Sequence, residues 1–284
     1  VETGLRLPFL LTRSKFSTQL QVAEAVGLRQ INDFGNDINQ SSRFVPLNDT
    51  LSVFFRDELN NGQLIYNRLE LSFFNLLKRS LRDLRSKWGQ TLNIEYHNTP
   101  FEGDFRGNLF AVRSNLYFPG LFKHHSSHLS LAHQRRKQAF NENGTFNSNQ
   151  YYFNNRIPKP RGYAYPDNEL FTTVQGNYLF PFWYPDWNLG PLLNIKRVKF
   201  NAFADLGWGR GENFFVERNV TSPRLLILNR SANYQSFGGE LMFDVNFMRF
   251  TGEFELGLRA VYSQANALSS GGLDIEFVLG SIGF

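Results

Sequence analysis

Four histidines stand close enough together in the sequence to suggest metal binding. His124, His125, His128 and His133 lie within ten residues, and imidazole is a common ligand of transition metals. Residues 125–139 alternate as a strand does, however, so His128 and His133 fall on opposite faces, and the first two histidines lie in a turn. We therefore expect no metal site, and the absence of cysteine excludes thiolate ligands and disulfides.

Two further patterns carry chemistry in other proteins but not here. The run Gly207-Trp208-Gly209-Arg210-Gly211 is rich in glycine, yet it lacks the Gly-Lys-Ser/Thr that a phosphate-binding loop requires. Ser126, His128 and Asp205 do not fall on one strand end or face, so no catalytic triad emerges. We expect a protein that is not an enzyme and uses no cofactor.

Alternation with a period of two residues is the dominant pattern in the chain. In residues 253–262, Phe254, Leu256 and Leu258 alternate with Glu253, Glu255 and Arg259, which is typical of a strand with one apolar and one polar face. The same pattern recurs in residues 90–101, 107–119, 197–208 and 237–247. No stretch approaches the ~18 consecutive apolar residues of a transmembrane helix. The sequence predicts an all-β protein.

A soluble β-sandwich would also alternate, but three features favour a transmembrane antiparallel up-and-down β-barrel. The expected strands are long, the polar face carries full charges in mid-strand, and aromatic residues make up 16% of the chain. Some of these cluster at expected strand ends, as in the girdles of membrane barrels. The expected interface aromatics are Trp183, Tyr184, Trp187 and Trp208.

Short and long connections alternate along the chain, as they do between the periplasmic and outer sides of such barrels. Placing Phe284 in the periplasm makes 139–167 and 209–233 outer loops, and makes 78–90 a periplasmic segment that could form a short interfacial helix. The expected strands are 1–12, 15–31, 63–77, 90–101, 107–119, 125–139, 168–182, 195–208, 234–248, 251–263 and 272–284. Asn60-Asn61-Gly62 is a hairpin signal that could make 49–59 a twelfth strand. Eleven strands fit the alternation of loop lengths better.

Three segments in a fixed order resemble a known superfamily. Pro160-Arg161-Gly162-Tyr163 precedes Asn177-Tyr178-Leu179-Phe180-Pro181, which precedes Phe203-Ala204-Asp205-Leu206-Gly207. This order resembles the BamA-like superfamily of outer-membrane insertases and two-partner secretion transporters, in which an Arg-Gly-Phe/Tyr loop folds back into the barrel lumen. In both that family and this chain, five strands follow the loop.

The resemblance implies a contact between Arg161 and Asp205. Asp205 lies on the polar face of its strand, where a guanidinium that entered the lumen would find a carboxylate and pair with it in bidentate fashion. Such a tether, with Gly162 and Tyr163, would order the loop. The chain departs from the family at Asn177, where a glutamate is expected, and this puts a clamp of two carboxylates in doubt.

The resemblance is closer still to barrels of Bacteroidota that follow a TolB-like propeller. It is carried by Leu5-Arg6-Leu7-Pro8-Phe9, Asn115–Leu121, Pro160–Tyr163 and Asn177–Trp187. It implies a barrel of about sixteen strands, of which residues 1–284 supply the C-terminal eleven or twelve as a single domain. The first strands and any periplasmic domain would then be absent from this sequence.

The last expected strand is irregular. Phe284, Ile282 and Val278 share one parity, whereas Leu273, Ile275, Phe277 and Leu279 lie on the other. The change of phase near Gly280 indicates a bulge or an unpaired tail. In the family this strand forms a weak seam with the first strand, and Gly280 and Gly283 would weaken such a seam.

These features lead to an expected location and three alternative functions. We expect a Gram-negative outer-membrane protein of BamA-like type, in contact with lipid, lipopolysaccharide and other outer-membrane or periplasmic proteins. It would act in outer-membrane protein assembly or polypeptide export, as a structural or accessory subunit of a larger membrane complex, or as a passive pore. Its 30 basic residues are spread among turns and polar strand faces, so we expect no nucleic-acid partner.

Overall fold

The structure is a computed structural model that describes most of the chain. The described residues are 1–31, 42–46, 51–56, 62–80, 83–101, 103–136, 151, 153–163, 168–190, 192–217, 224–247, 253–266 and 271–282. In these residues the chain forms strands and connections but no helix. The described residues therefore include no helix that is long and apolar enough to span a membrane. The expectation of an all-β protein is confirmed.

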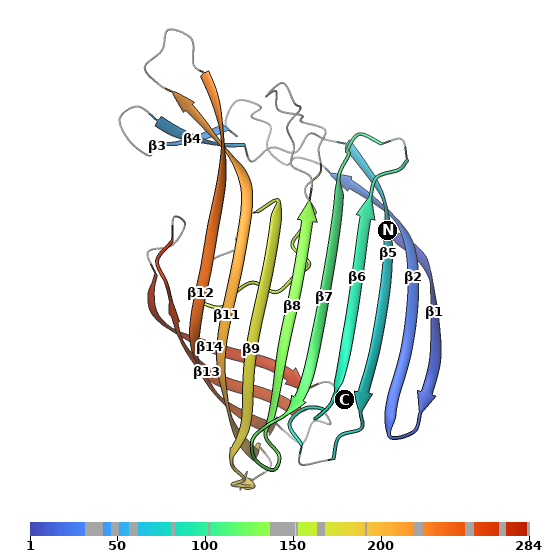
Figure 1. Ribbon diagram of the computed structural model, residues 1–284, viewed down its shortest axis with the longest axis vertical. Helices are drawn as coiled ribbons and strands as arrows, with labels where there is room; N and C mark the ends of the chain where they lie inside the picture. The colour runs from blue at the N-terminus through green and yellow to red at the C-terminus, as the bar shows by residue number, and fades with distance from the viewer. Residues whose placement is uncertain are drawn as a thin grey trace.

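One antiparallel sheet contains all the strands of the described chain. Eleven of them follow each other as neighbours, up and down, in the order β1-β2-β5-β6-β7-β8-β9-β11-β12-β13-β14 (Figure 1). Their bounds are β1 Glu2–Arg13, β2 Phe16–Ile31, β5 Gly62–Leu77, β6 Gly89–Asn98, β7 Asn108–Pro119, β8 Ser126–Arg136, β9 Leu170–Trp183, β11 Leu193–Glu217, β12 Arg224–Phe247, β13 Glu253–Ser263 and β14 Gly272–Ile282. Among the described residues, β1 and β14 do not pair with each other, so the sheet is curved but not closed.

The remaining strands lie beside this path. β10 (Trp187–Leu189) pairs with the start of β11. β3 (Ser42–Pro46) and β4 (Leu51–Arg56) form a hairpin, and β4 pairs with the far end of β11, where Val53 lies opposite Phe215. The segment 49–59 therefore adds no twelfth strand between β2 and β5, which pair directly.

The structure corrects three expectations. Residues 209–233 are not simply a loop, because β11 and β12 continue as a paired hairpin through Glu217 and Arg224. The described residues of 78–90 contain no helix. Of the two irregularities expected for the last strand, the bulge near Gly280 is absent, since β13 and β14 stay in register from Ser263–Gly272 to Glu253–Ile282. The unpaired tail would fall on residues 283–284, outside the described residues.

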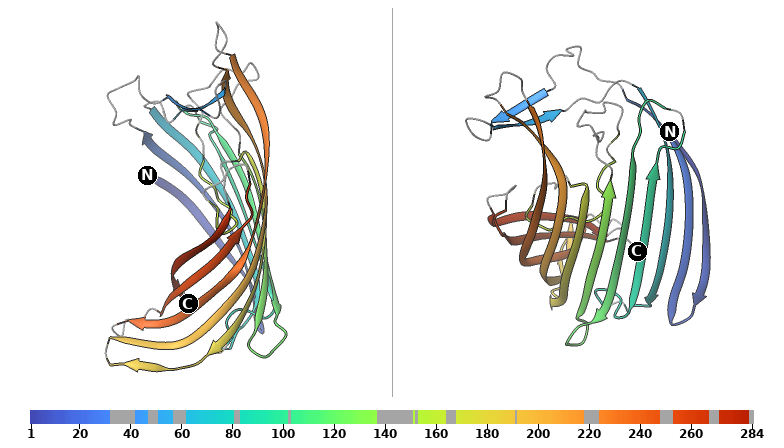
Figure 2. Two further views of the ribbon diagram at one scale, coloured as in Figure 1. Left: turned by 90° about the vertical axis from the view of Figure 1, so that its left-hand side faces the viewer. Right: turned by 45° about the horizontal axis from the view of Figure 1, so that its top comes forward.

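The two faces of the sheet differ in polarity in the way that the alternation predicts. The inner, concave face carries residues such as Asn201, Asp205, Glu240 and Asp244, all buried. The outer face carries exposed apolar side chains; Leu258 is 54% and Phe277 is 68% exposed. Figure 2 shows the curvature of the sheet, with β13 and β14 folded around toward the concave side.

The pairing of β4 with β11 can be tested by cysteine crosslinking, because the chain has no cysteine of its own. Residues directly opposite each other in an antiparallel pair have Cβ atoms about 4.5–5.5 Å apart. We expect the V53C/F215C variant to form a disulfide on mild oxidation, seen as a mobility shift on a non-reducing gel. The V53C/F214C control should crosslink far less, because position 214 is one residue out of register with Val53. Equal crosslinking of the two variants would contradict the register.

Candidate functional site

The segment 153–163 lies against the inner face of the sheet, on its concave side (Figure 2). Its first half is held by two side chains of β8. Gln134, which is fully buried, donates to the side-chain oxygen of Asn155 at 2.7 Å and accepts from the backbone N–H of Arg156 at 2.7 Å. Arg136 donates to the carbonyl of Phe153 at 3.1 Å. Two of these bonds satisfy backbone groups of a segment that has no strand partner among the described residues.

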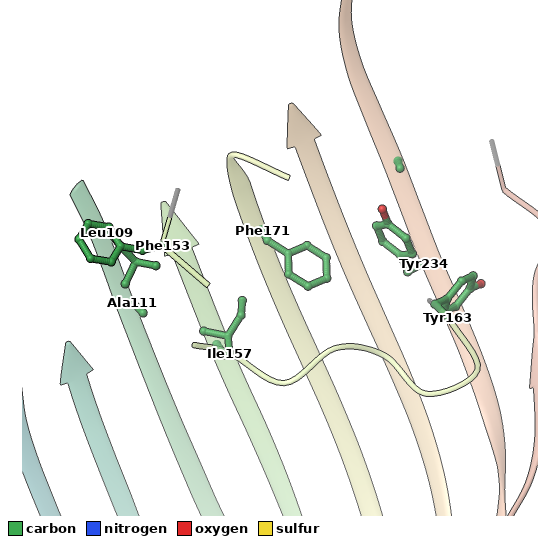
Figure 3. Packing of buried hydrophobic residues seen from close by; sticks show 9 residues of the cluster. Leu109, Ala111, Phe153, Ile157, Tyr163, Phe171 and Tyr234 are labelled. Carbon is green, nitrogen blue, oxygen red and sulfur yellow. The ribbon is translucent and has the colours of Figure 1, made fainter. Parts of the chain in front are cut away.

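Apolar side chains of the same segment cover the inner face toward the upper ends of the strands. Phe153, Ile157 and Tyr163 of the segment pack with side chains from β7, β8, β9 and β12, as Figure 3 shows. The sheet contributes Leu109, Ala111, Ala132, Phe171, Ala232 and Tyr234. The segment therefore packs on the inner face as part of a hydrophobic cluster and does not depend on polar contacts alone.

Arg161 and Asp205 form a bidentate ion pair at the end of this segment. The Arg161 Nε and Nη2 atoms each lie 2.8 Å from a different oxygen of Asp205, and the backbone N–H of Arg161 donates to the same carboxylate at 3.0 Å. Asp205 has no solvent exposure, and the guanidinium carbon lies 3.7 Å from the ring centroid of Phe203. The contact between Arg161 and Asp205 that the sequence predicts is thus present, with two parallel bonds that fix its orientation.

A second carboxylate completes the coordination of Arg161. Its Nη1 donates to Glu240 of β12 at 3.1 Å. Glu240 also accepts from Arg259 of β13 at 2.6 Å, and Arg259 donates to Glu276 of β14 at 2.8 Å. Charges therefore alternate in sign along the series Asp205, Arg161, Glu240, Arg259 and Glu276, so each of them has a partner of opposite sign.

Neutral amides fill the remaining positions around the guanidinium. Asn177 accepts from Arg161 Nη2 at 2.9 Å and from the amide of Asn201 at 3.0 Å. Asn201 also donates to Glu240 at 2.8 Å, and Gln175 donates to Asp205 at 3.3 Å. Asparagine at 177 therefore keeps a hydrogen bond to the arginine, while the second negative charge comes from another strand.

The two residues that follow Arg161 fit their positions closely. Gly162 has a φ of +78°, and a Cβ there would lie 3.0 Å from the buried side chain of Val261. The Tyr163 hydroxyl lies 2.8 Å and 2.7 Å from the carbonyl oxygens of Gln235 and Gln264. Glycine relieves both the backbone strain and the crowding, so the chain can turn directly after Arg161.

The histidines do not gather into one site. His124 pairs with Asp83 at 3.0 Å, His125 lies 2.9 Å from the Tyr178 hydroxyl, and His133 lies 2.8 Å from the hydroxyl of Thr172. Across the described ranges, no group of three His, Cys, Asp or Glu side chains is arranged to hold a metal ion. His124, His125 and His133 each make a hydrogen bond with a different neighbouring residue.

Exposed aromatics lie toward both ends of the outer face. Trp183, Tyr184 and Trp187 stand at the turn after β9, with the two tryptophan rings 4.8 Å apart. Trp208 lies within β11 and not at its end, because the strand continues to Glu217, but it pairs with Thr172 near the start of β9. Other exposed aromatics near that same end are Tyr96, Phe110 and Tyr262.

The expected seam residues are described only in part. Gly280 and Ile282 pair with Glu255 and Glu253 of β13. A Cβ on Gly280 would make ordinary contacts with Glu255, at 3.5 Å and beyond, so space does not require a glycine there. Gly283 and Phe284 lie outside the described residues.

Several residues of the network were not singled out from the sequence. Glu240 and Arg259 stand on predicted polar strand faces, but strand alternation gives no sign that they meet Arg161. Gln134 and Arg136 likewise show their role only when the segment lies across them. The sequence feature that could have indicated this network is the high density of charged residues in the middle of the strands.

The arrangement ties the segment 153–163 to the sheet, since each of its charged groups is paired with a group of opposite charge. No protein-family model, no curated protein and no solved structure matches this chain. The geometry of the site therefore has to carry the functional argument.

The tether predicts a large loss of stability when one partner is removed. We expect R161A to lower the free energy of unfolding by roughly 3–5 kcal/mol, because it leaves the fully buried Asp205 without its cation. D205A should lower it by less, because Arg161 then still pairs with Glu240. The double variant should lose less than the sum of the two, and R161K should retain only part of the stability because a lysine cannot form both bonds. Urea unfolding in detergent measures all four.

R210Q is the matched control, because Arg210 is exposed on the outer face of the strand that carries Asp205. It should change stability by less than ~0.5 kcal/mol. Additive losses in R161A and D205A would show that the two side chains do not act as a pair.

Proposed function

We propose that this chain forms most of a transmembrane β-barrel of a bacterial outer membrane. The observation that carries the proposal is the inverted polarity of the sheet, with exposed apolar side chains outside and a buried charge network inside. A soluble sheet would bury its apolar face, whereas lipid favours this arrangement. Strand length agrees, since β6, the shortest of the eleven neighbouring strands, has 10 residues, and a tilted membrane strand needs about 9–11.

Closure of the barrel is part of this proposal. Open sheet edges are not tolerated in the hydrocarbon region, because unpaired backbone groups find no water there. Further strands between β1 and β14 would satisfy both edges, and a total of about sixteen follows from the BamA-like resemblance.

We infer further that the barrel is of BamA-like type and acts, without catalysis, in outer-membrane protein assembly or polypeptide export. Support comes from the order of the three sequence segments and from the contact of Arg161 with Asp205 on the inner face. β14 also offers a strand edge with which a client strand could pair. Fold analogy alone does not fix a function, so this step rests on analogy.

A structural or accessory subunit is the second candidate, and the segment on the inner face favours it. This segment is held by an apolar cluster and by ion pairs, which suits a barrel whose interior is permanently filled. The same covering counts against a passive pore.

Membrane insertion predicts a depth-dependent effect of charge on the outer face. Leu258 and Tyr262 lie on the same face of β13 and both are exposed. We expect L258R to weaken folding into lipid vesicles by about 2–4 kcal/mol and Y262R, nearer the strand end, by about 0–1 kcal/mol. Vesicle folding titrations read by band shift on unheated gels measure both. If L258R is as harmless as an ordinary surface substitution, the outer face does not contact lipid.

The roles can be separated by a photoreactive amino acid at Leu279, on the outer face of β14. A protein that assembles or exports other polypeptides should crosslink there to newly made outer-membrane proteins in cells. An accessory subunit should instead co-purify in fixed stoichiometry with a larger complex and give no such adducts. Steady conductance of the pure protein in planar bilayers would point to the passive pore.

A further inference from the structure

Three connections lie next to one another at the lower end of the sheet in Figure 1. They join β1 to β2, β5 to β6 and β7 to β8, which are six successive neighbours in the sheet. The backbone N–H of Lys78 donates to the carbonyl of Lys15 at 3.1 Å, linking the first two connections. His124 lies 3.0 Å from Asp83, linking the second to the third.

The surface at these connections is strongly basic. Its lysine and arginine residues, which we call the basic rim, are Arg13, Lys15, Lys78, Arg79, Arg85, Lys87 and Lys123. Apart from Lys87, all are exposed, and none of these exposed residues has a carboxylate within ion-pair distance among the described residues. The connection at the opposite end of β6 and β7, residues 99–107, contains two acidic residues and one basic residue.

Asp83 is the carboxylate that the described part of these connections contains, and its charge is already used. It accepts from the backbone N–H of Ser80 at 3.2 Å and pairs with Lys87 at 3.2 Å and with His124. Burial alone would raise the pKa of Asp83, but the bonds from His124, Ser80 and Lys87 lower it to about 2. Asp83 thus stays ionised at neutral pH, and its charge is satisfied within the rim.

Apolar side chains stand among these cations. Leu121 is 85% and Phe122 is 70% exposed, and the pair stands immediately before Lys123 in the connection from β7 to β8. Trp88 is also exposed, and its ring meets that of Phe118 edge to face at 6.1 Å. Exposed aromatics beside lysine and arginine are typical of a surface at the boundary between hydrocarbon and headgroups.

We propose that the basic rim binds the phosphate of anionic phospholipid headgroups in the membrane leaflet at this end of the sheet. This inference rests on the proposed membrane barrel. The cations match the charge of the headgroup, while Trp88, Leu121 and Phe122 enter the acyl boundary beside them. An acidic protein would match the charge but leaves the exposed apolar residues without a role.

The test uses Trp88 as a fluorescent reporter in the chain. The chain has 4 tryptophans, and the substitutions W183F, W187F and W208F leave Trp88 alone. This parent is reconstituted in phosphatidylcholine vesicles containing brominated phosphatidylglycerol or, separately, brominated phosphatidylcholine. We expect stronger quenching by the anionic lipid, with a preference that declines as salt is raised.

Charge variants locate the effect. R79Q/K123Q should reduce the preference for phosphatidylglycerol by about fivefold or more, since one basic residue near an anionic surface contributes about that factor. R135Q/R210Q is the matched control, because these two exposed arginines lie at the other end of the sheet, both opposite Leu170. The control should keep the preference of the parent.

The outcomes separate this proposal from the one on which it rests. Equal quenching of the parent by both lipids overturns headgroup binding and leaves the membrane barrel intact; a rim used by an acidic protein gives this result. A loss of preference in R135Q/R210Q as large as in R79Q/K123Q also overturns it. Absence of quenching by either lipid contradicts the membrane barrel as well.

Discussion

The structure depends on the burial of the Arg161 guanidinium between two carboxylates from different strands. Removing a charge from water costs several kcal/mol, and Asp205 has no contact with solvent. The cost is offset only because Arg161 donates five hydrogen bonds, one of them from its backbone, to Asp205, Glu240 and Asn177. These bonds require the segment 153–163, β9, β11 and β12 to keep their relative positions, so one side chain joins elements far apart in the sequence.

The same network explains how the inner face can be polar and still closely packed. Arg259 extends the alternation of charge to β13 and β14, and a separate group joins Asp244 to Arg197 at 2.7 Å and to Lys199 at 2.8 Å. With the charges paired inside, apolar side chains remain on the outer face. The polarity of the sheet is thus the reverse of that in a soluble sandwich, which buries its apolar face.

The two ends of the sheet differ in the interactions that their side chains make. At the upper end, an apolar cluster around Phe153 and Tyr234 holds the segment on the inner face. At the lower end, hydrogen bonds between successive connections draw exposed cations together into the basic rim. The apolar cluster fills the concave side, whereas the basic rim presents positive charge to the surroundings. The two ends can therefore contact different partners.

The sequence by itself determined the class of fold, the eleven neighbouring strands and the assignment of residues to faces. It could do so because strand alternation is local: residues such as Asp205 and Leu206 must point to opposite sides whatever else the chain does. The resemblance of three segments to a known superfamily also implied Asp205 as the partner of Arg161. Only the tertiary structure decided that Glu240 supplies the second charge, that β11 and β12 continue beyond Trp208, and that β14 has no bulge at Gly280. These features depend on which strands lie side by side and on where a segment crosses them, and alternation within one strand carries no information about either.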